Sequence, residues 1–292
     1  MITTARSGYL DNFDFDLKQL KANKGDFTVV SSGLTRKIIF KEEYDDAPFK
    51  RLYFGNSNND NLPGVHMVSA VRKNIDSYIA KGGKIPKLKY MPKLILYNFE
   101  EINRISLKNQ SSESKESTYA IDINACFFKT AYNLGYFTEE LYSKAWKRRK
   151  DWKFGLLASI GSLNKHETID TYKEGVLVES NLNTDYIDTY SPFYWSVINY
   201  VAEVMMEIAH SLGDDFYMWL TDCVYLNEDR KKSVEKILDK HNYEYKDFYI
   251  EFKDLDEKMV KWYDFKAKGD KFINHNVYLN YSPSYNPFKK QE

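Results

Sequence analysis

The sequence has few cysteines, no long apolar run and no excess of either charge. Two cysteines, Cys126 and Cys223, are too few for a disulfide framework, and no C-x-x-C or Cys/His cluster indicates a zinc site. No apolar run reaches the length of about 18 residues that predicts a membrane-spanning helix. The N-terminus also lacks the basic start and apolar segment of a secretory signal. We therefore expect a cytoplasmic protein without a membrane partner.

The charges balance, with 42 Lys and Arg against 42 Asp and Glu, so the formal net charge is zero. This balance argues against a protein that coats nucleic acid by bulk charge, although a local basic patch remains compatible with it. Apolar residues make up 43% of the chain and aromatic residues 16%, which predicts a folded protein with a sizeable core. A length of 292 residues suits one large domain or two ordinary ones.

One polar segment, residues 109–118, contains no apolar side chain and predicts a linker. It separates a small mixed α/β region, residues 1–108, from a second domain, residues 119–292. In the first region the pattern predicts short strands at residues 28–30, 37–40 and 51–54. It also predicts one helix at residues 65–80, which ends at Gly82-Gly83.

The second domain begins with a β-branched strand at 119–123 and continues with helices and a hairpin. The clearest helix is predicted to start at Ser191-Pro192 and to end at Gly213. Because the elements do not alternate in a βαβ order, we expect an α+β fold whose central antiparallel sheet is flanked by helices. The other predicted elements are helices at 126–134, 137–163 and 229–241, a hairpin at 216–226 that turns at Thr221-Asp222, and strands at 248–252 and 259–265.

Two carboxylates interrupt apolar strands, Asp122 at the end of one strand and Asp222 at the tip of the hairpin. A buried carboxylate is costly unless it is paired, hydrogen-bonded or bound to a metal. Two of them on neighbouring strands suit a two-metal site for phosphoryl transfer. The alternative is a pair of structural carboxylates, one that caps a strand and one in a turn.

Between these carboxylates lies a basic segment with a single acid, Asp151. Within it, Arg149 and Lys153 would share a helix face at i, i+4 and are candidates to contact a triphosphate. The alternative is a solvated helix face, which is common for such charge runs. The basic residues are Lys144, Lys147, Arg148, Arg149, Lys150 and Lys153.

The order of these segments resembles the palm of family B DNA polymerases, with the protein-primed phage branch nearest. Residues 122–127 (Asp-Ile-Asn-Ala-Cys-Phe) resemble the first palm motif, and Lys153 with Gly161 resembles the fingers motif. The hairpin residues 219–225 resemble the motif that ends in Asp-Thr-Asp-Ser, and residues 276–278 resemble the Lys-x-Tyr motif. The resemblance spans about residues 117–280. It implies that the protein comes from a phage or mobile element and acts in the cytoplasm of a bacterial host.

The resemblance implies a role for each matching residue. Asp122 and Asp222 would bind two Mg²⁺ ions, and Lys153 would contact the triphosphate of a dNTP. Phe127 would stand where the family has a Tyr that excludes the ribose 2′-hydroxyl, and Tyr278 would touch the primer. The implied partners are a DNA primer and template, with other replication proteins as further candidates. On its own, Phe127 would be interpreted as a core aromatic.

The sequence also departs from the family pattern. Leu220 replaces the first hairpin Asp, Ile160 replaces the fingers Tyr, and Asn276 replaces the Lys of the last motif. The fingers, at residues 136–163, would be very short, the thumb minimal, and no exonuclease motif is present. The alternatives are therefore a catalytically eroded palm-like module that binds nucleic acid or a replication partner, and a template-independent or primer-making transferase.

Overall fold

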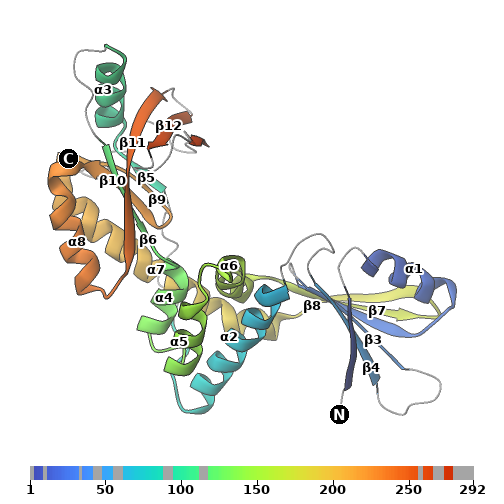
Figure 1. Cartoon of the computed structure of the whole chain (residues 1–292). Helices are drawn as coiled ribbons and strands as arrows, with labels where there is room; N and C mark the ends of the chain where they lie inside the picture. The colour runs from blue at the N-terminus through green and yellow to red at the C-terminus, as the bar shows by residue number, and fades with distance from the viewer. Residues whose placement is uncertain are drawn as a thin grey trace. The chain divides into compact units, whose positions relative to one another are not determined.

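The structure is a computed structural model that describes residues 3–8, 12–32, 35–41, 48–54, 62–87, 95–111, 118–255, 259–265 and 273–278. The chain forms two compact units, each built from two separate stretches. Unit 1 contains Met1–Lys89 and Phe127–Ile198, and unit 2 contains Tyr90–Cys126 and Asn199–Glu292. The division therefore differs from the one expected at residues 109–118, because residues 127–198 cluster with the N-terminal region. In Figure 1 each unit accordingly combines segments of distant colours.

In unit 1 the described strands form a mixed sheet in the order β1-β4-β3-β2-β7-β8. Neighbours are antiparallel except for β1 and β4, which are parallel. Strands β2 and β7 join the two stretches of the unit, and Phe27 stacks on its cross-strand partner Tyr172 with ring centroids 4.5 Å apart. The strands are β1 (Thr3–Gly8), β2 (Phe27–Ser32), β3 (Thr35–Lys41), β4 (Pro48–Phe54), β7 (Glu167–Lys173) and β8 (Val176–Leu182).

The helices of unit 1 begin and end at residues that the sequence marks. Thr138 caps α5, because its side chain accepts a hydrogen bond from the Leu141 amide at 3.3 Å. Gly82 follows α2 and Gly135 follows α4, and both have a positive φ, at 86° and 78°, which favours glycine. The helices are α1 (Phe13–Ala22), α2 (Leu62–Ala80), α4 (Cys126–Asn133), α5 (Glu139–Lys147), α6 (Lys153–Gly161) with the 3₁₀ turn η2 (Ser162–Asn164), and the first part of α7 (Thr184–Leu212).

Helix α7 starts earlier than the sequence predicts. It begins at Thr184, so Pro192 lies inside the helix instead of at its first turn. The side chain of Asn183 accepts a hydrogen bond from the Tyr186 amide at 3.3 Å, as a capping residue does. The prediction placed the start at the proline because proline favours a first turn, but a long helix tolerates one when packing offsets the lost hydrogen bond. The predicted end at Gly213 is confirmed.

In unit 2 the described strands form a sheet in the order β13-β12-β11-β6-β10-β9-β5, with antiparallel neighbours throughout. The predicted hairpin is β9 and β10, with its turn at Thr221-Asp222. The elements of the unit are β5 (Ile95–Tyr97), α3 (Phe99–Gln110), β6 (Thr118–Ile123), the last part of α7, η3 (Gly213–Asp215), β9 (Phe216–Leu220), β10 (Cys223–Asn227), η4 (Glu228–Arg230), α8 (Lys231–Lys240), β11 (Tyr245–Leu255), β12 (Met259–Phe265) and β13 (Ile273–Tyr278).

The centre of this sheet has a split βαβ topology. Strands β6 and β9 are connected through α7 and lie on either side of β10, whereas β10 and β11 are connected through α8 and lie on either side of β6. The β6-α7-β9-β10-α8-β11 order with strand order β11-β6-β10-β9 is that of a ferredoxin-like core. The predicted α+β class with a central antiparallel sheet and flanking helices is thus confirmed, and residues 127–198 form an insertion between β6 and the second part of α7.

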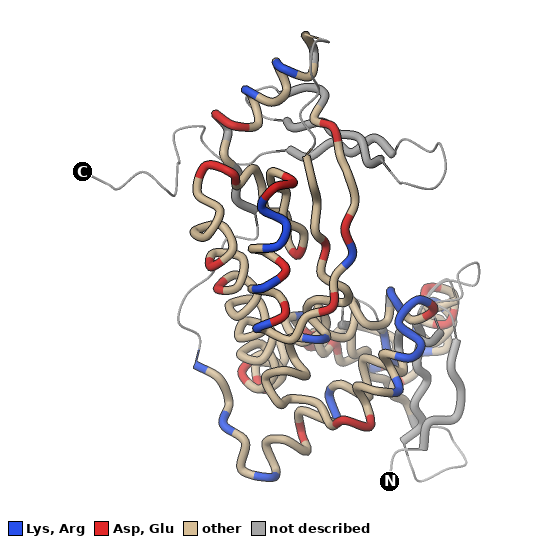
Figure 2. The backbone as a smooth tube through the Cα atoms, turned by 60° about the vertical axis from the view of Figure 1, so that its left-hand side comes forward, with Lys and Arg blue, Asp and Glu red and all other residues tan. Residues whose placement is uncertain are grey.

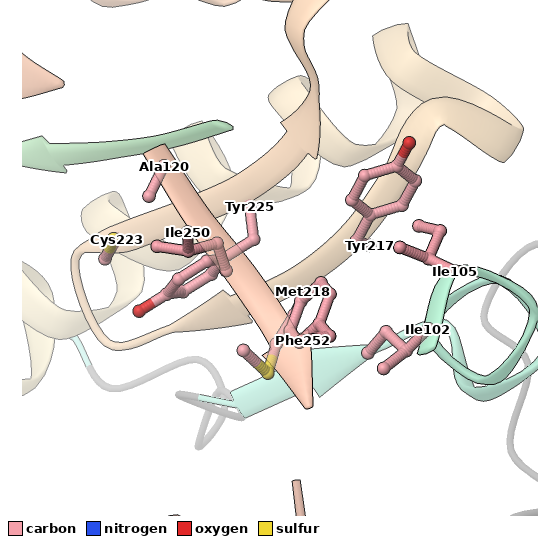
Figure 3. Close-up of a cluster of buried hydrophobic side chains, with 9 residues drawn as sticks. All are labelled: Ile102, Ile105, Ala120, Tyr217, Met218, Cys223, Tyr225, Ile250 and Phe252. Carbon is pink, nitrogen blue, oxygen red and sulfur yellow. The ribbon is translucent and has the colours of Figure 1, made fainter. Parts of the chain in front are cut away.

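Different helices pack against the two faces of this sheet. On one face a buried cluster includes Ala120, Tyr225 and Phe252, and Ile102 and Ile105 project from α3 toward it (Figure 3). On the other face Lys231, at the start of α8, donates to the Tyr119 hydroxyl at 2.6 Å. Residues that alternate along a strand point to opposite faces, so Asp122 shares the face of Ala120, opposite α8.

Candidate functional site

Asp122 lies near the end of β6, between one residue of each neighbouring strand. Its Cα partner on β10 is Cys223, and its partner on β11 is Lys246. Residues paired across antiparallel strands share a face, so these three side chains lie together. The Lys246 Nζ atom forms an ion pair with Asp122 Oδ2 at 2.6 Å, and the two side chains are 57% and 23% exposed. Asp122 is thus a partly buried carboxylate with a more exposed cationic partner.

Asp222 lies in the turn between β9 and β10, as the sequence predicts. Thr221 adopts a φ of 55°, and its carbonyl accepts a hydrogen bond from the Trp219 indole at 3.0 Å. The Asp222 carbonyl accepts a hydrogen bond from the Ile123 amide at 3.0 Å, and Ile123 directly follows Asp122. The structure therefore brings Asp122 and Asp222 to the same end of the sheet, on antiparallel neighbours.

The charges at this end of the sheet act on one another. Partial burial lowers the pKa of Lys246, but the hydrogen bond to Asp122 and the charges of Asp122 and Asp222 outweigh burial, so the pKa is raised overall. Burial raises the pKa of the Cys223 thiol well above its ordinary value, and the charges of Asp122 and Asp222 raise it further. The ammonium of Lys246 is thus held protonated, whereas the thiol is held neutral and is a poor nucleophile.

Asp122 and Asp222 are the residues of this site that could hold magnesium together with a substrate. Mg²⁺ is commonly held by one or two carboxylates together with waters and substrate phosphates. Asp122 and Asp222 supply two carboxylates, while no group of three or more His, Cys, Asp or Glu side chains in the described part of the chain is placed to hold a metal. Metal binding would also require the ammonium of Lys246 to leave the Asp122 carboxylate.

The two basic residues expected to share a helix face do not lie on one helix. Arg149 lies in the turn between α5 and α6, and Lys153 is the first residue of α6. The Arg149 guanidinium lies over the Trp146 ring at 4.8 Å and donates to the Trp146 carbonyl at 3.2 Å, whereas Lys153 is exposed. The i, i+4 argument therefore fails because the helix ends at Lys147. Both residues belong to unit 1, and their contact with a triphosphate stays a prediction.

The remaining two candidates are Phe127 and Tyr278. Phe127 is half-buried in the first turn of α4, between the fully buried Cys126 and Phe128. Its partial exposure differs from the core position that a lone aromatic would suggest. Tyr278 ends β13, where its backbone pairs with Met259, and its side chain lies outside the described residues.

Sequence reasoning missed Lys246, the side chain that forms an ion pair with Asp122. This lysine is the second residue of a strand rich in aromatic residues, and no motif in the sequence singles it out. Only the pairing register of β6 and β11 brings it to Asp122. A register is set by contacts across the whole sheet, so the local sequence gives no signal for this pair.

Comparison with known proteins identifies no relative of this chain. No protein-family model, curated protein or solved structure matches the chain. Among the described residues, no helix is long and apolar enough to cross a membrane.

Proposed function

We propose that this chain is a metal-dependent nucleotidyltransferase with a palm-type site, which adds a nucleotide from a dNTP to a 3′-hydroxyl. The 3′-hydroxyl would lose its proton to water, and its oxygen would form a bond to the α-phosphorus while the bond between that phosphorus and the bridging oxygen breaks and pyrophosphate leaves. Asp122 and Asp222 would hold two Mg²⁺ ions, which activate the attacking oxygen and stabilise the charge on the leaving group.

The observation that carries this proposal is the meeting of Asp122 and Asp222 at one end of an antiparallel sheet. They are 100 positions apart in the sequence, yet the Ile123 amide donates a hydrogen bond to the Asp222 carbonyl. The split βαβ core supports the same conclusion. It places the end of β6, where Asp122 lies on the face opposite α8, beside the β9–β10 turn that contains Asp222. The inserted stretch, residues 127–198, contains the short segment that the polymerase resemblance assigns to the fingers.

The other candidate residues receive substrate-binding roles in this proposal. Lys153 and Arg149 would donate to triphosphate oxygens. Phe127 would form a steric wall against a ribose 2′-hydroxyl, and Tyr278 would contact the primer strand. A DNA primer and its template would be the partners.

A primer-extension assay with and without template tests the proposal. Asp122→Asn and Asp222→Asn should each abolish extension that depends on Mg²⁺ while leaving the fold intact. Asp247→Asn is the matched control, since Asp247 also pairs with a lysine, Lys231, but it contacts α8 on the other face of the same sheet. Extension that survives both site variants would contradict the proposal, and extension without template would assign a template-independent transferase.

A second candidate function, an eroded palm-like module that binds nucleic acid or a replication partner without chemistry, is favoured by two observations. The Lys246 ammonium lies 2.6 Å from Asp122, where it neutralises the carboxylate in place of a metal. Leu220, in place of the family's first hairpin carboxylate, packs partly buried against the apolar cluster. This candidate predicts that wild type and Asp122→Asn are equally inactive and bind nucleic acid equally.

A further inference from the structure

A basic surface covers the last turn of α5 and the turn that follows it. Lys144, Lys147, Arg148 and Lys150 are all exposed, and Asp151 is the only acid in residues 144–153. The chain as a whole is neutral, and Figure 2 shows basic and acidic positions interspersed along much of it. This segment therefore concentrates positive charge in a protein that otherwise balances it.

Aromatic rings lie beside these cations in a stacked row. Tyr132 of α4 stacks on Tyr142 of α5 with ring centroids 3.9 Å apart, and Tyr142 stacks on Trp146 at 5.2 Å. Tyr142 is buried at the middle of the row, whereas Tyr132 and Trp146 at its ends are half-buried. Lys129 is itself buried, and its ammonium lies 4.7 Å from the centre of the Tyr142 ring. The buried residues Tyr142 and Lys129 thus hold the row in place, and the rings at its two ends, Tyr132 and Trp146, are partly exposed.

Two arginines continue this arrangement into the turn. The Arg149 guanidinium lies 4.8 Å from the Trp146 ring centre, and the Arg148 guanidinium lies 5.3 Å from that of Trp152. Trp152 is half-buried, just before α6. Each indole is therefore paired with a planar cation. Indole rings and guanidinium planes are the surfaces on which unpaired bases stack.

We propose that this tryptophan–arginine surface, made of Trp146, Arg148, Arg149 and Trp152 with the exposed lysines 144, 147 and 150, binds single-stranded nucleic acid. The lysines would neutralise backbone phosphates, and the rings would stack with bases. Duplex is disfavoured, because its bases are stacked on one another and offer no free faces to the indoles. The surface uses neither Asp122 nor Asp222, so this inference does not depend on nucleotidyl transfer.

The first test is fluorescence anisotropy with the full chain and labelled oligo(dT), oligo(rU) and duplex DNA, each of about 20 nucleotides. The single strands, or one of them, should bind more tightly than the duplex. Lys144→Gln with Lys147→Gln should weaken binding and reduce the salt dependence by about 1.4 in the log–log slope, at about 0.7 per phosphate. The matched control is Lys232→Gln with Lys236→Gln on α8, also exposed, which should change neither.

The second test separates stacking from charge. Trp152→Leu should weaken the binding of oligo(dT) about 5- to 150-fold. Because that variant could disturb α6, Arg148→Lys serves as a second probe: it keeps the charge, so it should weaken binding without a change in salt slope. Duplex bound as tightly as single strands, or full affinity in both stacking variants, would overturn the proposal. Asp122→Asn should bind like wild type, so that loss of catalysis and loss of this surface are distinguished.

Discussion

Replacing Lys246 tests whether its ammonium occupies the position of a metal ion. The change is Lys246→Gln, which removes the cation that lies 2.6 Å from Asp122. Asp122 would then lack this counter-charge, and a divalent cation would no longer compete with the ammonium. We therefore expect Lys246→Gln to bind Mg²⁺ more tightly than wild type does.

The size of this effect follows from the exposure of the pair. Exposed ion pairs contribute about 0.2–1 kcal/mol. Lys246 is 57% exposed, which argues for screening, but Asp122 is only 23% exposed, so the upper end of about 1 kcal/mol applies. Since about 1.4 kcal/mol corresponds to a tenfold change, the affinity for Mg²⁺ should rise about fivefold. Without Mg²⁺, the variant should lose about the same free energy of unfolding.

Isothermal titration calorimetry with MgCl₂ measures the affinity, and thermal unfolding with and without Mg²⁺ measures the linked stability. Asp122→Asn should abolish the tight binding. Lys231→Gln is the control, because Lys231 pairs with Asp247 on the α8 side of the sheet and should leave Mg²⁺ affinity unchanged. An affinity that is unchanged or weaker in Lys246→Gln would refute the reasoning that the ammonium and the metal compete for Asp122.

Three further outcomes are expected. In urea unfolding, Gly135→Ala should lower the free energy of unfolding by about 1–2 kcal/mol, because its φ is positive. Gly175→Ala has a similar φ of 77° but should cost clearly more, because its Cβ would clash with the Lys21 carbonyl oxygen. Equal losses in the two variants would contradict this reasoning. Hydrogen bonds from Lys240 and His241 lower the pKa of Glu207, so its stabilisation is present above its ordinary pKa and lost as the pH falls through the lowered one. The destabilisation by Glu207→Gln should therefore shrink between about pH 7 and about pH 3, and a constant difference would exclude this linkage. The Cys223 thiol, buried and with a raised pKa, should resist iodoacetamide at neutral pH until the protein unfolds, as mass spectrometry would detect.

The elements that the sequence predicts best are those with strong local signals. Thr138 caps a helix and Gly135 follows one, and the hairpin predicted from the polar Thr221-Asp222 step between apolar runs is confirmed. These signals depend on a few neighbouring residues. The predicted helix start at Ser191-Pro192 was wrong, because the effect of a proline on a helix depends on tertiary packing as well as on sequence.

The parts that could not be predicted depend on long-range pairing. The β7–β8 hairpin carries a Glu174-Gly175 turn with positive φ at both residues, a typical two-residue turn, but its pairing with β2 joins positions far apart in the chain. The ion pair between Lys246 and Asp122 likewise depends on the register of β6 and β11. The candidate site was predictable in its two aspartates, because a carboxylate in an apolar strand is costly, but not in its lysine.

The interleaved order of the two units has a consequence for synthesis on the ribosome and for dissection of the protein. Unit 1 cannot complete its sheet until β7 and β8 have emerged, by which point β6 of unit 2 has long been exposed without its partners β10 and β11. Unit 1 can therefore fold only after residue 198 has emerged, and until their partners emerge β2 and β6 each have an unpaired edge. A cut within residues 109–118 would leave each fragment with an incomplete sheet. A deletion of residues 127–198 that joins β6 to the second part of α7 would instead remove strands from unit 1 alone.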